Sequence, residues 1–492
     1  MTNFSVLIPM IIYLAIVYWL GFYSNKIRKN TSKDGFIEEY FLGGRSMGAF
    51  VLAMTLVATY ASASSFIGGP GVAYKMGFGW VLLAMVQLPT AYLTLGVLGK
   101  KFAIISRKIK AVTINDFLRE RYRSKVVVMI GSISLIIFFI AGMVAQFIGG
   151  ARLFETVTGL SYNTGLVIFA ITVIIYTTVG GFRAVTLTDA VQGVIMIIGT
   201  IALLIGTINY GGGINNIVLN LKRIDPDLLT PYGPNSFIAK PFILSFWVLV
   251  CFGVIGLPQT AIRCMGYRDS KSMHRAMIIG TFVIGFLMLG MHMIGVFGRA
   301  IIPDLTVGDK VMPELTLKVL NPVFAGIFLA GPLAAIMSTI DSQLILAAAT
   351  IVKDLYINYI NPNAEKCERG INVLEKLSVY STAIIGIIVF LASFNPPNLI
   401  VWINLFAFGG LQAAFLWPII LGLYWKRANA AGVIASMISG IGSYFYFVSV
   451  VKRFMGMHVI VPTLGIALVT LVIVSLITSP PKDEIIQIFW EE

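Results

Sequence analysis

The feature that most constrains this chain is a series of long apolar stretches that recurs from one end to the other. A helix needs roughly 20 apolar residues to cross the hydrocarbon core of a bilayer, because lipid offers no partner to an unpaired peptide group. The sequence therefore predicts an all-α polytopic membrane protein with about thirteen transmembrane helices. We place them at residues 5–23, 48–71, 78–99, 126–149, 163–181, 189–209, 241–261, 276–298, 322–350, 375–394, 398–424, 430–450 and 459–478.

Charged residues are scarce and unevenly placed. Only 12% of residues are charged, against about 25% in ordinary globular domains. A net charge of +14 is compatible with nucleic acid, but most Lys and Arg fall in alternate connections, with the largest groups at 25–45 and 100–125. Cytoplasmic loops carry the excess of Lys and Arg. The pattern excludes nucleic acid as a partner and predicts the inner (plasma) membrane, with the N-terminus outside and the C-terminus cytoplasmic.

The first apolar stretch is either a cleaved signal peptide or a retained anchor. A signal peptide begins with a positively charged region. Here no cation precedes the stretch, and Lys26, Arg28 and Lys29 follow it. We therefore expect residues 1–25 to form an extra N-terminal transmembrane helix.

Residues suited to metal binding or covalent catalysis are few. The chain has three Cys and three His, without a CxxC pair or an HExxH motif. A nucleophile needs a neighbouring base, and Ser65 has no His close in sequence. The sequence favours a protein that is not an enzyme and holds no metal other than a transported ion.

Two of the apolar stretches are interrupted at mid-depth. The second has small polar residues followed by a Gly-Gly-Pro-Gly sequence at 68–71, and the seventh has Gly253, Gly256 and Pro258. Irregular backbone at membrane depth is tolerated only where it is buried in protein or lines a cavity. Close packing of helices on small residues is the alternative.

The two interrupted stretches lie five stretches apart. Because five is odd, units built from stretches two to six and seven to eleven enter the membrane with opposite orientations. This predicts two inverted five-helix repeats with discontinuous first helices, at residues 40–210 and 241–425, joined by an outer loop at 211–240. Two C-terminal transmembrane helices and a short tail occupy 426–492. Substrate and ion are expected near the midplane, where the first helices break.

Two connecting segments have patterns of their own. Residues 111–125 alternate apolar and cationic positions at helical spacing, and Thr113 and Asp116 are spaced as a capping box. This segment is expected to lie along the inner membrane surface. The segment 211–240 is either a solvated loop or a cover over the mouth of a pathway.

Four motifs resemble the sodium:solute symporter family, and the resemblance covers nearly the whole chain. They begin at Tyr40 (YFLGGRSMG), Gly180 (GGFRAVTLTDAVQ), Ala334 (AAIMST) and Trp425 (WKRANAAG). The segments 62–71, 246–258 and 300–306 resemble the members that carry pantothenate. The resemblance implies a LeuT-like fold and sodium-coupled uptake of pantothenate by alternating access. Another small monocarboxylate, or proline, is the alternative substrate. No obligate protein partner is expected beside the lipid bilayer.

The resemblance also implies a sodium site, with sodium as the co-transported ion. By motif, the ligands are backbone oxygens of Ala58 and Ala61, with Ala335, Ser338 and Thr339 from the ninth stretch. Unwound backbone supplies carbonyl oxygens to a cation without adding net charge in lipid. A hydroxyl in an apolar helix bonds either an ion or the carbonyl one turn back, and both alternatives are open for Ser338 and Thr339.

Two carboxylates are predicted to lie on the ion pathway. Asp189 begins the sixth stretch and Asp341 lies in the ninth, and an ionisable group inside a membrane usually faces a cavity. The alternatives are a helix N-terminal cap for Asp189 and an acid kept neutral by burial for Asp341. Moving an anion with one sodium ion transfers no net charge, whereas each charge moved through about 100 mV is worth about 2.3 kcal/mol. We therefore hypothesise a second cation, held by these two acids.

The substrate is expected to be a small anion with hydroxyl and amide groups, so its pocket should combine polar groups with an apolar wall. No buried cation is evident as the partner of its carboxylate unless Arg152 turns inward, and a half-helix N-terminus is the alternative. Phe66, Trp80 and Trp247 are expected to be lipid-facing or packing residues, with gates as the alternative, and His292 is expected to be a packing residue. The substrate-binding candidates are Thr59, Tyr60, Ser62, Ser64, Ser65, Gln87, Gln146 and Gln259.

Overall fold

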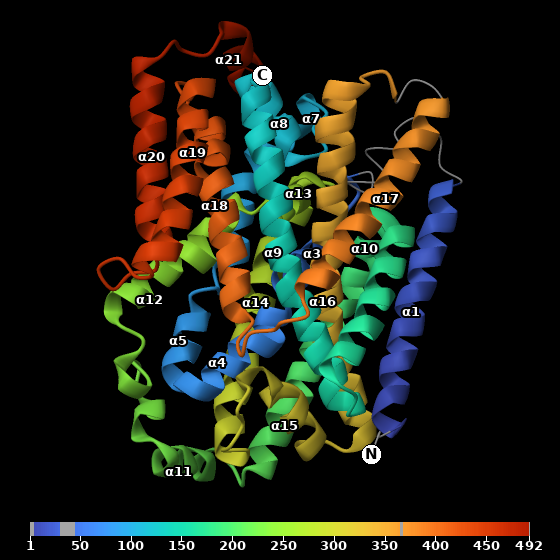
Figure 1. Cartoon of the computed structure of the whole chain (residues 1–492), viewed down its shortest axis with the longest axis vertical. Helices are drawn as coiled ribbons and strands as arrows, with labels where there is room; N and C mark the ends of the chain where they lie inside the picture. The colour runs from blue at the N-terminus through green and yellow to red at the C-terminus, as the bar shows by residue number, and fades with distance from the viewer. Residues whose placement is uncertain (1–3, 30–44, 365–367, 492) are drawn as a thin grey trace.

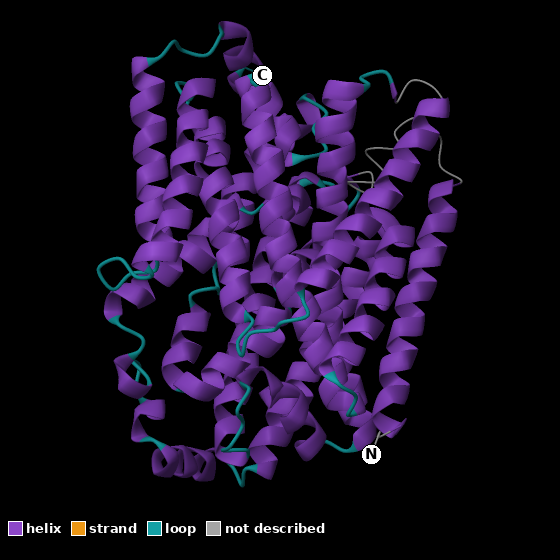
Figure 2. Cartoon of the chain, viewed as in Figure 1, coloured by secondary structure: helices purple, strands orange, loops and turns teal. Residues whose placement is uncertain are grey.

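The structure, a computed structural model, describes residues 4–29, 45–364 and 368–491. Figure 2 shows that helices form almost all of this part of the chain, and the described residues contain no strand. The N- and C-termini lie at opposite ends of the helix bundle (Figure 1). The predicted all-α class is confirmed.

Most long helices run along the long axis of the molecule (Figure 1). The first half contains α1 (Phe4–Lys29), α3 (Ala49–Tyr60), η2 (Ser64–Gly68), α4 (Gly69–Met76), α5 (Phe78–Met85), α6 (Thr90–Thr94), η3 (Leu95–Gly99), α7 (Lys100–Lys108), α8 (Ile114–Tyr122), α9 (Lys125–Thr158), α10 (Tyr162–Tyr210), α11 (Ile214–Ile224), η4 (Pro226–Leu229) and η5 (Pro234–Ser236). The second half contains α12 (Lys240–Phe246), η6 (Trp247–Cys251), η7 (Phe252–Gly256), α13 (Pro258–Met265), α14 (Ser270–Ile301), η8 (Gly308–Lys310), α15 (Val311–Val319), α16 (Pro322–Ala349), η9 (Thr350–Ile360), α17 (Glu368–Ala392), α18 (Val401–Tyr424), α19 (Ala430–Tyr446), η11 (Phe447–Val451), α20 (Ile460–Ile477) and α21 (Asp483–Trp490).

Nine helices among the described residues are long and apolar enough to cross a bilayer, and two bent helix pairs raise the number to eleven. Two shorter apolar helical segments, Ser5–Trp19 and Tyr162–Ile175, stand where the first and fifth stretches were predicted. The chain is thus a multi-pass membrane protein, but the predicted total of thirteen spans is not confirmed.

Helix α10 covers the fifth and sixth predicted stretches as one helical segment of 49 residues. Thr177 of α10 donates a hydrogen bond to Asp341 of α16. Asp189 of α10 accepts one from Ser338, which lies one turn earlier in α16. A straight helix would separate Thr177 from Asp189 by about 18 Å, so the chain must turn back between them. The two predicted stretches are therefore antiparallel, although helical structure continues through their predicted connection.

Helix α8 has the predicted capping box, because Thr113 and Asp116 bond each other's backbone N–H groups. The position of this segment along the inner membrane surface stays a prediction. Most of α8 is buried within the protein, and the fully buried Arg121 donates from Nε to the carbonyl oxygen of Gly422 in α18 at 2.8 Å. The alternating cationic pattern therefore serves packing at the end of the bundle where the C-terminus lies.

The segment 211–240 is more ordered than a plain loop. It contains α11, with η4 and η5 after it, and lies at the N-terminal end of the bundle (Figure 1). A Cβ atom on Gly77 would lie 2.0 Å from the carbonyl oxygen of Leu228, and one on Gly79 would lie 2.5 Å from that of Pro231. The segment thus packs closely over the start of α5.

Candidate functional site

The second predicted stretch is broken between α3 and η2, with a bend of 65°. The break lies at Ala61 and Ser62, before the Gly-Gly-Pro-Gly sequence, which sits inside the η2–α4 helix. The freed backbone groups find partners: the N–H of Ala63 donates to Oε1 of Gln146 at 2.7 Å, and that of Ser64 donates to Oγ of Ser62 at 3.2 Å. The prediction of a break in this stretch is confirmed, and the break includes Ala61, one of the two residues of the second stretch expected to offer backbone oxygens.

The seventh predicted stretch is broken between η7 and α13, with a bend of 49°. Pro258 occupies the first position of α13, where its missing N–H costs no helical hydrogen bond. A Cβ atom on Gly256 would lie 2.8 Å from Cα of Leu416, so glycine permits close contact with α18. The seventh stretch is therefore broken, as predicted, and one of its glycines also allows close packing of helices, which was the alternative explanation.

A hydrogen bond joins the two breaks. The hydroxyl of Tyr60, the last residue of α3, lies 2.9 Å from the carbonyl oxygen of Val250 in η6 and 2.6 Å from Oε1 of Gln87. Because Tyr60 has one proton to donate, it bonds one of these acceptors at a time. A polar contact therefore connects the first helices of the two predicted repeats.

The break of α3 faces three oxygen atoms of the predicted ion site. Oγ1 of Thr339 lies 3.1 Å from the carbonyl oxygen of Ala61 and 3.0 Å from that of Ala335. Ala58 is fully buried in the last turn of α3. Thr339 thus makes the bond one turn back and also reaches the broken helix.

Ser338 behaves differently from Thr339. Its hydroxyl donates to Oδ1 of Asp189 and makes no bond to the carbonyl one turn back within the described structure. Thr55 of α3 donates to Oδ2 of the same carboxylate at 2.5 Å. Asp189 is therefore a buried acceptor between α3 and α16, and its interpretation as a helix N-terminal cap is wrong, since it lies inside α10.

The structure adds a residue that the sequence interpretation assigned to an inner loop. Arg263 of α13 is fully buried, and its Nη2 lies 3.5 Å from Oδ2 of Asp189 and 2.5 Å from Oγ of Ser342. An unpaired charge is costly in a protein interior. Loss of either Arg263 or Asp189 would therefore leave the other as an isolated buried charge. One sequence feature could have indicated that Arg263 is buried: it lies one turn after Gln259, on the helix that follows the break.

Asp341 is also fully buried and accepts a hydrogen bond from Thr177 of α10. Both predicted acids therefore contact hydroxyl groups at the interface of α10 and α16. Asp189 and Asp341 lie close to the predicted sodium ligands, as the sequence indicated.

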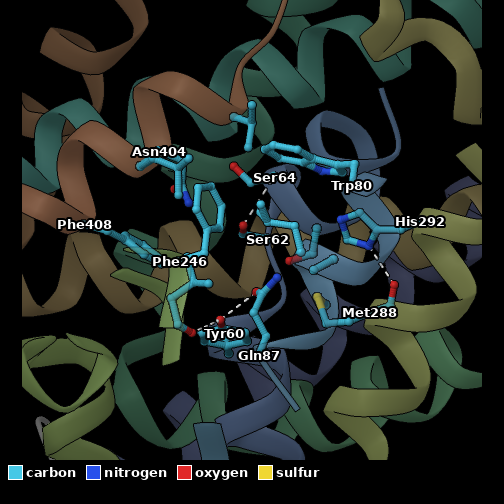
Figure 3. A pocket seen from close by; sticks show the side chains of 17 residues that line it. Tyr60, Ser62, Ser64, Trp80, Gln87, Phe246, Met288, His292, Asn404 and Phe408 are labelled. Atoms are coloured by element: carbon cyan, nitrogen blue, oxygen red, sulfur yellow. Dashed lines mark hydrogen bonds between the residues drawn. The ribbon is translucent and has the colours of Figure 1, made fainter. Parts of the chain in front are cut away.

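A cavity lies beside the break of α3, with about 500 Å³ of empty space that is partly open to solvent. Figure 3 shows its wall, to which 17 residues contribute. Five of the eight predicted substrate-binding residues line it: Tyr60, Ser62, Ser64, Ser65 and Gln87.

The other three predicted residues do not line this cavity. Gln146 is fully buried and bonds the backbone at the break, as well as Asn404. Gln259 is buried in α13 beyond the second break, and Thr59 points elsewhere in the last turn of α3. Polarity on a broken helix did not distinguish side chains that face the cavity from those that support the backbone.

Two residues expected only to pack contribute to the cavity wall. The ring of Trp80 contacts those of Phe246 and Trp402 edge to face, with centroid distances of 5.6 and 6.0 Å. His292 of α14 lies on the wall with Met288 (Figure 3). By contrast, Phe66 is buried away from the cavity and Trp247 is 47% exposed, as expected for packing and lipid-facing residues.

Arg152 does not turn toward the cavity. Its Nη1 lies 3.1 Å from Glu155, and its guanidinium stacks on Tyr162. None of the residues that line the cavity is charged. The carboxylate of an anionic ligand there would therefore meet hydroxyl, amide and ring groups and no fixed cation.

Two broken helices joined by a polar contact, with an oxygen cluster and a cavity beside the break, define a secondary transporter of the inverted-repeat class. The model of the Sodium:solute symporter family matches residues 40–440, so the chain belongs to that family. It is 53% identical over 471 residues to the sodium/pantothenate symporter of Haemophilus influenzae, and the match covers 96% of each chain. It is 52% identical over 469 residues to the sodium/pantothenate symporter of Escherichia coli K12, covering 95% of this chain and 96% of the relative.

The structure resembles that of a Na⁺-coupled sialic acid symporter in its substrate-bound, outward-open state. The TM-score is 0.76, and the match covers 98% of this chain and 100% of the other at 19% identity. At this identity the likeness shows the fold, and the predicted LeuT-like fold is confirmed.

Proposed function

We propose that this protein takes up pantothenate together with sodium by alternating access. The observation that carries the substrate assignment is the identity of 52–53%, over nearly the whole chain, to two sodium/pantothenate symporters. The hydroxyl, amide and ring groups of the cavity offer hydrogen bonds and apolar contact to a small polar substrate. Another monocarboxylate, or proline, is the alternative. The chain acts as a transporter and carries out no chemical conversion of its substrate.

We place the sodium ion between the break of α3 and helix α16. Its ligands are the carbonyl oxygens of Ala58, Ala61 and Ala335 and the hydroxyl oxygens of Ser338 and Thr339. The Thr339 hydroxyl has one proton, so it bonds the carbonyl of Ala61 or that of Ala335 at a time. Sodium would instead be coordinated by both carbonyl oxygens and by Oγ1. Because Ser338 donates its proton to Asp189, its own lone pairs are left to face the ion. Sodium thus ties the broken helix to α16, and its departure frees them to move.

We place pantothenate in the cavity of Figure 3, beside the second half of the broken helix. The hydroxyls of Ser62, Ser64 and Ser65 offer donors to its carboxylate, and Oγ of Ser64 has no hydrogen-bond partner in the described part of the chain. Trp80 and Phe246 supply apolar wall. The ion and the substrate bind at the same break of α3. Binding of one therefore stabilises the conformation that binds the other.

The two acids have different roles in this proposal. Asp189 has its charge balanced by Arg263 and acts by orienting the Ser338 hydroxyl. Asp341, fully buried one turn after Ser338 in α16, is our candidate ligand for a second cation, which would let the membrane potential drive uptake of an anion. This replaces the hypothesis that both acids hold the second cation.

The finer arrangement in the membrane is also part of the proposal. Residues 40–210 and 241–425 form the two inverted repeats, and the protein works in the inner membrane without an obligate protein partner. The Lys- and Arg-rich segments of α7 and α8 lie at the end of the bundle that carries the C-terminus (Figure 1). By the excess of cations in cytoplasmic loops, that end faces the cytoplasm and the N-terminus is outside.

Radiolabelled pantothenate uptake into membrane vesicles tests this function. Uptake should require an inward sodium gradient, stop when potassium replaces sodium, and be blocked by unlabelled pantothenate but not by proline or glucose. Uptake that is equal in sodium and potassium would refute sodium coupling, and block by proline alone would favour the alternative substrate. Collapsing the membrane potential at fixed sodium should slow uptake; unchanged uptake excludes the second cation.

A further inference from the structure

His292 has one ring nitrogen fixed by the backbone. The side chain is 3% exposed, and its Nδ1 lies 2.7 Å from the carbonyl oxygen of Met288, one turn back in α14. A carbonyl oxygen only accepts hydrogen bonds, so we assign the proton to Nδ1. In the neutral ring, Nε2 is then an acceptor.

The other nitrogen, Nε2, faces the cavity and lies directly over the backbone of the second broken half-helix. A Cβ atom on Gly69 would be 2.3 Å from Nε2, so only glycine leaves room for the ring. Gly69 in the Gly-Gly-Pro-Gly sequence at 68–71 is thus needed to make space for the ring of His292. Within the described residues Nε2 makes no hydrogen bond, whereas Nδ1 is satisfied. The ring therefore presents an unused acceptor to the cavity, as Figure 3 shows beside Trp80.

A purely structural role does not explain this placement. A Ser or Thr at this position of α14 could equally donate a hydrogen bond to the carbonyl one turn back. Thr200 of α10 makes such a bond to the carbonyl oxygen of Met196, at 2.7 Å. An acceptor on a cavity wall can bond a donor group that a ligand brings into the cavity, and such a bond adds to the binding free energy. The cavity residues include no charged side chain, so a second proton on the ring would be an isolated charge there.

We infer that His292 is a selectivity-determining residue that accepts a hydrogen bond from a hydroxyl group of the substrate. A carboxylate, which only accepts, cannot bond a neutral Nε2 and instead meets the hydroxyls of the serines at the break. The inference rests on the proposed function: pantothenate carries a carboxylate at one end and two hydroxyls at the other. His292 then distinguishes hydroxylated acyl groups from apolar ones of the same shape.

A comparison of two ligands on the unaltered transporter is the first test. N-(3,3-dimethylbutanoyl)-β-alanine has the skeleton and carboxylate of pantothenate but lacks both hydroxyls. We expect it to compete with labelled pantothenate about five- to tenfold more weakly than unlabelled pantothenate does, the size of one net hydrogen bond. If it competes equally well, the inference is overturned whatever any variant does.

The second test removes the acceptor. His292→Phe should weaken competition by pantothenate by about the same five- to tenfold and leave competition by the dideoxy compound unchanged, so that the variant no longer separates the two ligands. The half-saturating concentration should rise while the maximal rate stays similar. His292→Gln restores an acceptor oxygen and should recover part of the preference.

A matched control lies on the same helix. His274 makes the same bond from Nδ1 to a carbonyl one turn back, at 2.7 Å to Ser270, but it is exposed. His274→Phe should leave the competition by both ligands unchanged. A structural role for His292 would instead lower the maximal rate for both ligands equally, and that result overturns the inference. Absence of any sodium-dependent pantothenate uptake by the unaltered protein would refute the proposed function rather than this inference.

Discussion

The guanidinium of Arg263 lies 3.5 Å from the carboxylate of Asp189, and both side chains are fully buried. The same carboxylate accepts hydrogen bonds from Thr55 of the broken helix α3 and from Ser338 of α16. Arg263 belongs to α13, the second half of the other broken span. One carboxylate therefore contacts both broken helices and a proposed sodium ligand, so movement of either helix must change the orientation of the Ser338 hydroxyl.

Arg263→Gln leaves Asp189 charged and without its cation. Removing one partner of a buried ion pair typically costs about 3–5 kcal/mol. We expect the variant to lose most sodium-dependent uptake and to unfold at lower temperature. Uptake per transporter in the membrane and thermal unfolding in detergent measure the two effects.

The double variant Arg263→Gln with Asp189→Asn separates charge balance from a specific role of the arginine. It removes both charges and should recover much of the stability that the single change loses. Arg268→Gln is the control, because Arg268 pairs with Asp269 on the surface, where its side chain is 69% exposed. A single Arg263 variant as stable and active as the control would contradict the assigned pairing.

Ser338→Ala removes a proposed sodium ligand without adding bulk. We expect the sodium concentration for half-maximal uptake to rise about tenfold or more, while the affinity for pantothenate at saturating sodium changes less, because the side chain does not line the substrate cavity. Thr339→Ala should act in the same direction. The measurement is pantothenate uptake across a range of sodium concentrations.

Thr350→Ala is a matched control for these changes. Thr350 continues the same helix and is buried, and among the described residues its hydroxyl bonds only the carbonyl one turn back, at 3.0 Å. Its loss should not alter the sodium dependence. An equal shift in all three variants would mean that loss of helix packing, and not of an ion ligand, raises the sodium requirement.

The sequence predicted the fold well where the physical constraint is local and strong. Apolar length locates the helices, and the matched interruptions of the second and seventh stretches indicate the inverted plan. The break lies at Ala61 and Ser62, before the glycines, whereas Gly69 and Gly71 serve close approaches, to His292 and to Asp309, that only tertiary structure creates.

The candidate site was less accessible to sequence interpretation. Arg263 resembles a topology-determining cation at a helix end, and only the turn of α10 brings Asp189 to it. Gln146 has the same polarity as Gln87, yet it supports the backbone while Gln87 lines the cavity. Which face of a helix points inward depends on packing between segments far apart in the chain, and hydropathy does not record it.

Gln146 gives a third prediction, about how the broken helix is stabilised. Gln146→Leu leaves the N–H of Ala63 buried without its 2.7 Å acceptor, a loss of about 1–3 kcal/mol. We expect a lower unfolding temperature and slower uptake. Gln146→Glu keeps an acceptor oxygen and should lose less hydrogen bonding to Ala63. Gln487→Leu, on an exposed face of α21, is the control, and equal unfolding temperatures for the two leucine variants would contradict the assignment.

Asp309 leads to a prediction about the pH dependence of stability. It is fully buried in η8, and its Oδ2 accepts a hydrogen bond from the backbone N–H of Ile400 at 3.0 Å, just before α18. Burial raises the pKa of this carboxyl from its usual 3.8 to about 7, against the Ile400 bond and the positive charges of Arg152 and Lys75, which favour ionisation. The folded protein therefore holds a proton here that the unfolded chain releases near pH 4.

Because the folded pKa is the higher one, the contribution of Asp309 to stability is largest below about pH 4 and is lost as pH rises to about 7, by up to about 1.4 kcal/mol per pH unit. Asp309→Asn keeps an acceptor oxygen but does not titrate. The free energy of unfolding of the variant, relative to the unaltered protein, should rise between about pH 4 and 7 and stay constant above. Asp304→Asn, at an exposed position of the same connection, is the matched control for loss of a carboxyl group. Chemical unfolding of the detergent-solubilised proteins at several pH values measures the difference, and a difference independent of pH would show that Asp309 is ionised in the folded state throughout this range.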